Sequence, residues 1–314
     1  MHARKNTGID FSLNYNSTPE KDFTWNMGIN FTHYKNEVTK LYKPEKIYYG
    51  GSTEPDQGAS VNQGTSVTME GQPISSFFGM NIIGIFHTSQ DVDRHVWQEG
   101  AAPGRWKFED TNGNDSIDFS NPHIDDRIIL GSPHPDFTIG IPMNFNYKGI
   151  SLDLFWYGSY GNETRNGYKS LDMLVSGYFE NNQFGKSILQ SWGMPGVCDR
   201  FAELPQVNAN TRDDAPMEYF DELSFYIEDG SFIRLSQLIL GYDFKVSTWK
   251  SIERFRIYIQ ANNLFTLTNY QGGDPGMTRA DDQSYGFVND FNLGLGSGPI
   301  PLPKSFLIGL NITL

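Results

Sequence analysis

The stretch 110–118 carries the side chains of this sequence that are best suited to hold a cation. Oxygen-bearing side chains occupy every second position in it: Asp110, Asn112, Asn114, Ser116 and Asp118. Oxygen ligands at such spacing can wrap one Ca²⁺ ion. Two departures weaken the pattern, because Asp115 stands where a glycine usually makes the sharp turn and Asn121 stands where a bidentate glutamate is expected. The alternative is a loop closed by Asx turns without an ion.

Aromatic residues in the long polar stretches form a second candidate set. They are Trp97, Trp106, Tyr168, Tyr178 and Trp192, accompanied by Phe179, Tyr219 and Phe220. Flat rings can stack on sugar rings or fill the pockets of a partner, so these residues are candidates for substrate binding. The same rings could instead pack the long stretches against each other, and the sequence leaves both roles open.

No catalytic arrangement is recognisable among the remaining residues. The six histidines show no paired ligand spacing, and the sequence contains no nucleophile elbow, phosphate-binding loop or HExxH motif. Acidic pairs such as Asp213-Asp214 lie in acidic stretches, where carboxylates are usually solvated. The single cysteine, Cys198, cannot form an internal disulfide. We therefore expect a protein that is not an enzyme and has no cofactor, with Ca²⁺ as the one candidate ion.

The elements that must position these residues follow from an alternation of apolar and polar side chains. At the end of the chain, apolar residues occupy every second position: Phe306, Ile308, Leu310, Ile312 and Leu314. Period-two alternation predicts strands with one apolar and one polar face. It predicts nine strands, at 7–16, 22–34, 62–70, 74–86, 136–147, 150–160, 231–244, 254–267 and 304–314. A phase slip at Ser236-Gln237 predicts a β-bulge.

Strand length and loop length together indicate the fold class. Most predicted strands have about ten residues, the length of a tilted strand that crosses a bilayer. Short connections (17–21, 71–73, 148–149 and 245–253) alternate with long ones (35–61, 87–135, 161–230 and 268–303). Outer-membrane barrels have short periplasmic turns and long extracellular loops. We therefore expect an all-β protein, an antiparallel transmembrane β-barrel with its four long loops outside the cell.

Charge and strand number refine this expectation. The net charge is −13, and the acidic residues gather in 87–135 (nine acidic, four basic) and 161–230 (twelve acidic, five basic), which argues against nucleic acid as a partner. The chain shows no apolar signal segment before its first strand. Nine strands are an odd number, and an open sheet would leave two unpaired edges in lipid. We therefore expect a C-terminal piece of a larger barrel.

Six ordered motifs span nearly the whole chain. They are GQPISSFFG at 71–79 followed by GIF at 84–86; PGRWKFEDTNGN at 103–114; DDRIILGSPHPDF at 125–137; EDGSFIRL at 228–235; NNLFT at 262–266 followed by Asp274-Pro275; and the closing strand 303–314. Together they resemble the C-terminal half of SusC/RagA-type TonB-dependent transporters of Bacteroidetes. Two positions depart from the family pattern, Asp115 in place of glycine and Leu314 in place of the usual closing phenylalanine.

The resemblance implies a fold, an activity and partners. It implies that residues 1–314 are the C-terminal part of a plugged barrel of about 22 strands, without the N-terminal plug. The whole protein would import oligosaccharides or peptides across the outer membrane, with a SusD-like lipoprotein over its extracellular loops and energy supplied by the TonB complex through the plug. The isolated chain is not expected to transport. Arg234, on the inner side of its strand, would pair with acids of the lumen or with the plug.

Two other interpretations remain open at this stage. The first is a soluble extracellular all-β module that binds glycans or acts in adhesion, in which the apolar strand faces would be buried in a sandwich. The second is a passive porin built from several copies of the chain. Both would contain strands, but the one-sided distribution of loop lengths and the order of the motifs favour the importer.

Overall fold

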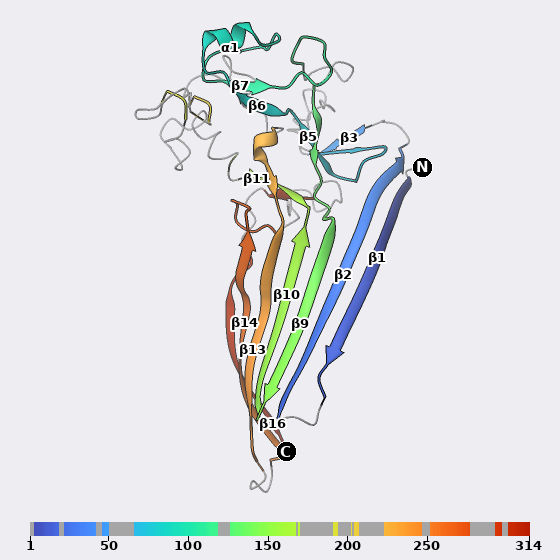
Figure 1. Ribbon diagram of the computed structural model, residues 1–314, viewed down its shortest axis with the longest axis vertical. Coiled ribbons are helices and arrows are strands. Elements are labelled where there is room, and N and C mark those ends of the chain that lie inside the picture. Colours follow the sequence, from blue (N-terminus) through green and yellow to red (C-terminus); the bar gives the residue numbers. More distant parts are fainter. Residues whose placement is uncertain are drawn as a thin grey trace, which may run out of the picture.

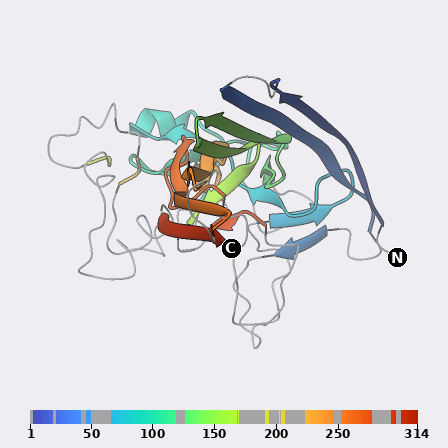
Figure 2. The same cartoon turned by 90° about the horizontal axis from the view of Figure 1, so that it is seen from below.

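A computed structural model describes residues 3–18, 22–41, 46–49, 66–118, 126–167, 169, 191–193, 202, 204–206, 223–246, 252–276, 293–296 and 301–314. Seven long strands dominate it: β1 (Ala3–Asn16), β2 (Phe23–Lys40), β9 (Phe137–Tyr147), β10 (Ile150–Tyr160), β13 (Phe232–Phe244), β14 (Arg254–Thr268) and β16 (Ser305–Thr313). They form one sheet in the order β1-β2-β9-β10-β13-β14-β16. The strands run along the long axis of the molecule (Figure 1), and from below they follow an open arc (Figure 2).

The register of the sheet brings the alternating apolar side chains onto one face. Leu152 of β10 lies opposite Phe145 of β9 and Leu240 of β13. Leu240 in turn lies opposite Ile259 of β14, which lies opposite Ile308 of β16. Because successive side chains of a strand point to opposite faces, the polar residues between them share the other face. These two surfaces are called the apolar face and the polar face below, and they confirm the predicted alternation.

Local features of the strands also agree with the sequence. Lys148 and Gly149 join β9 to β10, and both have positive φ angles, 48° and 90°. Positive φ at both central residues is the requirement of the two-residue hairpin turn that matches strand twist. The pairing of β13 with β14 shifts register between Leu235 and Gln237, so the bulge predicted there is confirmed.

The number of sheet-forming strands differs from the prediction of nine. β2 pairs directly with β9, with Phe31 opposite Ile139, and this pairing leaves no place in the sheet for the predicted strands 62–70 and 74–86. β2 also continues to Lys40, into the predicted loop 35–61. The stretches 35–61 and 87–135 are therefore not separate connections, because both precede β9 within one connection that begins after β2.

The two misplaced segments form short strands outside the sheet. They contain β4 (Ser66–Met69), β5 (Ser76–Gly79) and β6 (Ile82–Ile85). In β5 the adjacent residues Phe77 and Phe78 are both buried, at 0% and 4% exposure. Side chains on both faces of this strand are therefore covered, whereas a barrel strand needs one face toward lipid. Consecutive apolar residues fit the covered position, and the period-two pattern alone does not distinguish it.

The cap is the group of smaller elements at one end of the sheet, residues 46–49, 66–131, 163–166, 191–193, 202–206 and 223–229 with 293–296, as far as the structure describes them (Figure 1). Besides β4, β5 and β6 it contains six short strands: β3 (Lys46–Tyr49), β7 (Trp106–Phe108), β8 (Ile128–Gly131), β11 (Glu163–Asn166), β12 (Ile227–Asp229) and β15 (Leu295–Gly296). These strands form three small sheets with the orders β3-β4-β5-β8, β6-β7 and β12-β11-β15. A short helix, α1 (Ser89–Asp93), begins with a capping box between Thr88 and Asp91.

A small apolar core holds part of the cap together. It consists of Met80, Ile85, Trp106, Phe108, Ile117, Leu204, Leu223 and Tyr226. These residues come from segments far apart in sequence, so the cap depends on long-range packing rather than on local pattern. Among the described residues, no helix is long and apolar enough to span a membrane.

Candidate functional site

The apolar face leaves large side chains exposed over much of the sheet. The exposed fraction is 68% for Ile9 in β1, and it is 74% for Phe306 and 80% for Ile308 in β16. A contiguous exposed apolar surface of this kind marks a site that meets lipid or a partner. Strands of this length with one apolar and one polar face are typical of strands that cross a bilayer, with the apolar face in contact with lipid.

The polar face carries a network of amide, hydroxyl and charged groups. Asn144 donates a hydrogen bond to Asp153, and Asn146 Nδ2 donates to Asn144 Oδ1 at 2.5 Å. Arg256 Nη2 donates to Ser151 Oγ at 2.7 Å and lies 3.8 Å from the Asp153 carboxylate. Groups that both donate and accept suit contact with water, a polar substrate or another polar surface. This face is therefore hydrophilic where these groups gather.

A recess of about 370 Å³ interrupts the polar face toward the end away from the cap. It is lined by residues that include Asn14, Asn26, Gly28, Asn144 and Gln237. A Cβ atom at Gly28 would collide with the Asn14 side-chain oxygen and lie 3.0 Å from Pro142 Cγ. Glycine at this position therefore keeps the recess open and the Asn14 amide accessible.

A buried ion pair joins the polar face to the chain beyond β14. Arg234 of β13 donates to Asp274 at 2.5 Å and, through Nε, to Thr266 Oγ1 at 2.8 Å. The side chains of Arg234 and Asp274 are only 6% and 7% exposed. The Asp274 carboxylate also accepts the backbone N–H groups of Gly276 and Leu302, at 2.8 and 3.2 Å. Arg234 therefore pairs with an acidic residue 40 positions later in the same chain. Its side chain lies on the polar face, where this acidic residue can reach it.

The loop around Asp110 is organised by side-chain bonds to the backbone. Asp110 Oδ1 accepts the N–H groups of Gly113 at 2.7 Å and Asn114 at 3.2 Å, and Oδ2 accepts that of Asp115 at 3.0 Å. Asn112 Oδ1 accepts the Asn114 N–H at 3.0 Å. These bonds are the Asx turns of the ion-free alternative. Calcium binding by this loop stays a prediction.

Asp126 anchors the same loop from the opposite side, and sequence reasoning assigned this residue no role of its own. Its side chain is fully buried. Oδ1 accepts the N–H of Thr111 at 2.9 Å, and Oδ2 accepts that of Asp118 at 2.8 Å. The only signal for Asp126 was its place in the family motif at 125–137. These contacts give the residue a structural role, because its one carboxylate binds both ends of the 110–118 loop.

The predicted aromatic residues lie in different environments. Trp97 is 63% exposed on the cap, so its ring is accessible to a ligand or partner. Trp106 is 4% exposed and belongs to the cap core, which favours the packing role for its ring. Trp192 packs on Gly104, where a Cβ atom would lie 2.6 Å from the indole ring. Tyr168 and Tyr178 lie outside the described residues, and a substrate-binding role for the five residues stays a prediction.

Acidic groups gather where the sheet meets the cap. Glu163 of β11 lies opposite Asp229 of β12. Burial raises the pKa of Glu163, and the negative charges of Asp136 and Asp229 raise it further. Within the described part of the chain, no group of three or more His, Cys, Asp or Glu side chains is arranged to hold a metal ion.

The sheet defines the class of protein first. A curved antiparallel sheet with membrane-length strands, one apolar face, one polar face and two open edges is a portion of a transmembrane β-barrel. Among solved structures, the RagAB peptide transporter matches 99% of this chain with a TM-score of 0.69 at 22% identity, and the match covers 29% of that chain. The prediction of a partial barrel is thereby confirmed.

Sequence comparison then shows which proteins the chain resembles. No family model matches the chain. Over 98% of its length it is 29% identical to TonB-dependent receptor P3 of Formosa agariphila and 25% identical to TonB-dependent receptor SusC of Bacteroides thetaiotaomicron. The chain is SusC/RagA-like, as its motifs predicted. It spans 28% and 26% of the length of these two relatives. All the named relatives are receptors or transporters, in agreement with the expectation that the chain is not an enzyme.

Proposed function

We propose that this chain forms part of the barrel wall of a SusC-like, TonB-dependent nutrient importer in the outer membrane. The observation that carries the proposal is the division of the seven-stranded sheet into an exposed apolar face and an amide-rich polar face. Lipid would cover the first face, and the second would line the lumen through which a polar nutrient passes. Similarity to TonB-dependent receptors along nearly the whole chain supports this assignment.

The cap supplies the surface for the remaining partners. It lies at one end of the sheet, with the described parts of the acid-rich connections, and we place that end outside the cell (Figure 1). A SusD-like lipoprotein would bind there, and the substrate would be an oligosaccharide or a peptide. Similarity to the RagAB peptide transporter supports the peptide class, and the oligosaccharide class rests on the resemblance of the sequence motifs alone. Contact with the TonB complex would be made by a plug that lies in other parts of the receptor.

The open edges of the sheet explain why the chain should need further strands. All six strand pairs are antiparallel, so β1 and β16, the first and last of seven, run in the same direction. An antiparallel barrel cannot close by joining these two edges, within one copy or between copies in the same membrane orientation. The geometry therefore disfavours a porin made of several copies. It requires an odd number of additional strands between the two edges.

The soluble glycan-binding alternative is disfavoured by the apolar face. In a sandwich, the apolar faces of two sheets cover each other. Here, the most exposed large apolar residues of the described chain include Leu13, Ile308 and Leu314, with 58%, 80% and 84% exposure. That surface would be unstable in water and is suited to a membrane.

Liposome swelling tests the proposal for the isolated chain. The 314-residue protein is reconstituted into liposomes, and swelling is followed with monosaccharides, oligosaccharides and short peptides. We expect no flux, because the sheet cannot close alone. Flux through the isolated chain would contradict the partial-barrel assignment.

In cells that carry the complete receptor, deletion of this segment should abolish uptake of the oligosaccharide or peptide that the receptor imports. Unchanged uptake would contradict an importer role.

A further inference from the structure

The sequence contains two asparagine–glycine dipeptides, Asn112-Gly113 and Asn166-Gly167. Asparagine followed by glycine is especially prone to spontaneous deamidation, because glycine has no side chain to hinder attack by its own backbone nitrogen. The structure places the two dipeptides in opposite surroundings. Asn112 and Gly113 are both exposed on the cap, whereas Asn166 is 1% exposed and Gly167 is buried. The exposed dipeptide, in the 110–118 loop, is therefore the one that water can reach.

Deamidation of the exposed dipeptide proceeds through a cyclic imide. The Gly113 backbone nitrogen loses its proton to hydroxide and attacks Asn112 Cγ. A new N–Cγ bond forms, the Cγ–Nδ2 bond breaks, and the side-chain nitrogen takes a proton from water and leaves as ammonia. Water then opens the ring at either carbonyl, which gives aspartate or isoaspartate. The reaction therefore needs a Gly113 N–H that can be deprotonated and an Asn112 carbonyl oxygen that can carry negative charge.

The turn at Asn112 prepares its side-chain carbonyl for attack. Asn112 Oδ1 accepts the N–H of Asn114 at 3.0 Å, and this Asx turn holds the carbonyl beside the backbone of the following residues. Negative charge develops on that oxygen when Cγ is attacked, and an N–H group already directed at it stabilises the charge. The backbone of Asn112 is held as well, because its N–H donates to Asp126 Oδ1 at 3.3 Å. The geometry of the turn therefore favours ring closure.

Asp110 opposes the reaction at the nitrogen. Its Oδ1 accepts the Gly113 N–H at 2.7 Å, the shortest of the three backbone hydrogen bonds to this carboxylate. A negative charge at this distance disfavours loss of the proton, because the deprotonated nitrogen would be a second anion beside the first. A carboxylate is also too weak a base to remove an amide proton itself. Asp110 therefore lowers the fraction of Gly113 that is able to attack.

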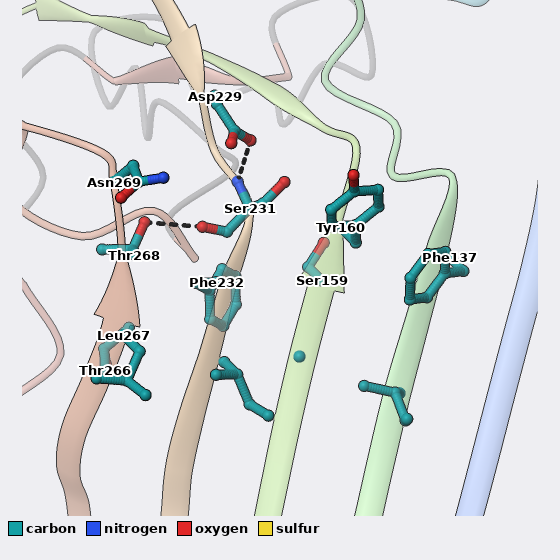
Figure 3. A pocket seen from close by; sticks show the side chains of 13 residues that line it. Phe137, Ser159, Tyr160, Asp229, Ser231, Phe232, Thr266, Leu267, Thr268 and Asn269 are labelled. Carbon is teal, nitrogen blue, oxygen red and sulfur yellow. Dashed lines mark hydrogen bonds between the residues drawn. The ribbon is translucent and has the colours of Figure 1, made fainter.

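The same arrangement recurs at the aspartate–glycine dipeptide of the sequence, Asp229-Gly230. Asp229 accepts the Ser231 N–H at 2.8 Å, at the edge of a recess of about 690 Å³ (Figure 3). The Gly230 N–H donates to the Asn162 carbonyl oxygen at 2.8 Å. In both turns the first side chain accepts the N–H two residues later, and another acceptor holds the glycine N–H. That acceptor is a backbone carbonyl at Gly230, whereas at Gly113 it is a side chain that one substitution can change.

We propose that Asn112 is a site of spontaneous deamidation and that Asp110 suppresses the reaction in the folded protein. The inference concerns one loop of the cap and does not depend on the proposed function. Isoaspartate would redirect the main chain through Cγ, and aspartate would add a charge to a loop that already carries Asp115 and Asp118. Either product weakens the loop beside Ile117, which is 1% exposed in the cap core. Asp110 thus protects the loop chemically as well as shaping it.

Peptide mapping by mass spectrometry tests the proposal. The 314-residue protein is incubated in detergent at mildly alkaline pH with EDTA, and amide-to-acid conversion is followed over time. In Asp110→Asn we expect conversion at Asn112 to be roughly tenfold faster than in the parent protein, the factor for replacing a charged acceptor by a neutral one. Asp118→Asn is the matched control. It removes the same charge from the same loop, but its carboxylate accepts the Asn114 side chain at 3.4 Å rather than the Gly113 N–H, so the parent rate is expected.

The buried dipeptide separates protection from unfolding within the same digest. Asn166 should stay intact in the parent and in both variants, because it is buried and its Nδ2 donates to Glu228 at 3.2 Å. Faster conversion at both asparagines in Asp110→Asn would mean that the cap has unfolded, and would count against a specific role of Asp110. Equal rates at Asn112 in the two variants, or slower conversion in Asp110→Asn, would overturn the proposal. A folded parent protein that converts as fast as the urea-unfolded protein would also overturn it.

Discussion

Two aspartates, Asp110 and Asp126, hold the loop 110–118 by different means. Asp110 lies inside the loop and turns it sharply by accepting three consecutive backbone N–H groups. Asp126 lies outside the loop, is fully buried, and binds its first and last parts. A buried acceptor that loses its role leaves backbone donors unsatisfied, which costs more than loss of an exposed bond. Asp126 is therefore the more critical residue, although the sequence drew attention to Asp110.

Replacement of this buried carboxylate tests the argument. In Asp126→Asn, one oxygen acceptor becomes an N–H₂ donor that faces the N–H of Thr111 or Asp118. We expect the cap to lose about 1–3 kcal/mol of stability. The readout is faster thermolysin cleavage within 109–118. Asp93→Asn, at an exposed position at the end of α1, is the control and should leave the rate unchanged. Equal rates for both variants would show that Asp126 does not organise the loop.

The Glu163 carboxylate gives a pH-dependent prediction. Its pKa is raised in the folded protein, first by burial and then by Asp136 and Asp229. An acid whose pKa is higher in the folded than in the unfolded protein favours the folded state while it is protonated. This contribution to stability is complete below the unfolded pKa and is lost as the pH rises through the folded pKa. Glu163→Gln keeps an acceptor for the Ser132 N–H, now 2.7 Å from the carboxylate, and removes the charge.

We therefore expect Glu163→Gln to melt at a higher temperature than the parent protein at about pH 8, and at the same temperature near pH 4, close to the ordinary glutamate pKa. Differential scanning fluorimetry across this range is the measurement. Glu99→Gln, at an exposed position of the cap, serves as the control with no expected gain. A gain for Glu163→Gln that is the same at all pH values would show that packing rather than charge is responsible.

At the scale of elements, the Arg234–Asp274 pair holds the chain after β14 against the sheet. Asp274→Ala would leave the Arg234 charge buried without its partner, and such a loss costs about 3–5 kcal/mol. We expect faster amide hydrogen exchange at Gly276 and Leu302, which lose their acceptor. Removing both charges, in Arg234→Met with Asp274→Leu, should restore part of the global stability but not the protection of these two amides.

The same strand provides the control. Asp243 at the other end of β13 pairs with Arg254 at 2.7 Å, but this pair is largely exposed. Exposed pairs contribute little because water and salt screen them. Asp243→Ala should therefore leave both stability and the exchange of Gly276 and Leu302 unchanged. A similar effect of Asp243→Ala and Asp274→Ala would mean that burial of the Arg234 pair does not determine its strength.

The sequence predicted the seven sheet strands and the bulge because each has a local cause, the alternation forced by one apolar and one polar face. It misplaced 62–70 and 74–86, since short apolar runs look alike in a barrel strand and in a strand covered on both faces. The cap depends on contacts that no local pattern contains. For example, Ser224 Oγ accepts the Ile82 N–H across 142 residues. The acidic residues that hold the 110–118 loop and pair with Arg234, Asp126 and Asp274, were recognisable in the sequence only as members of motifs.

The whole molecule is an unclosed wall, and its two faces should meet different surroundings. Trp25 and Trp156 are on the apolar face by register, opposite Phe145 and Ile141, whereas Trp97 is exposed on the cap. In phospholipid bilayers, quenchers attached to acyl chains should therefore reach the first two indoles. A water-soluble quencher such as iodide should reach Trp97.

Fluorescence of the protein in bilayers with brominated acyl chains makes this measurable. The double variant Trp25→Phe with Trp156→Phe should lose most of the quenching by bromine and keep the quenching by iodide. Trp97→Phe should show the reverse, and it is the matched control because it removes one indole without touching the sheet. If Trp97 accounts for the bromine quenching, the cap rather than the sheet lies in the membrane. In that case the exposed apolar face must be covered by protein, and the sheet would not be a barrel wall.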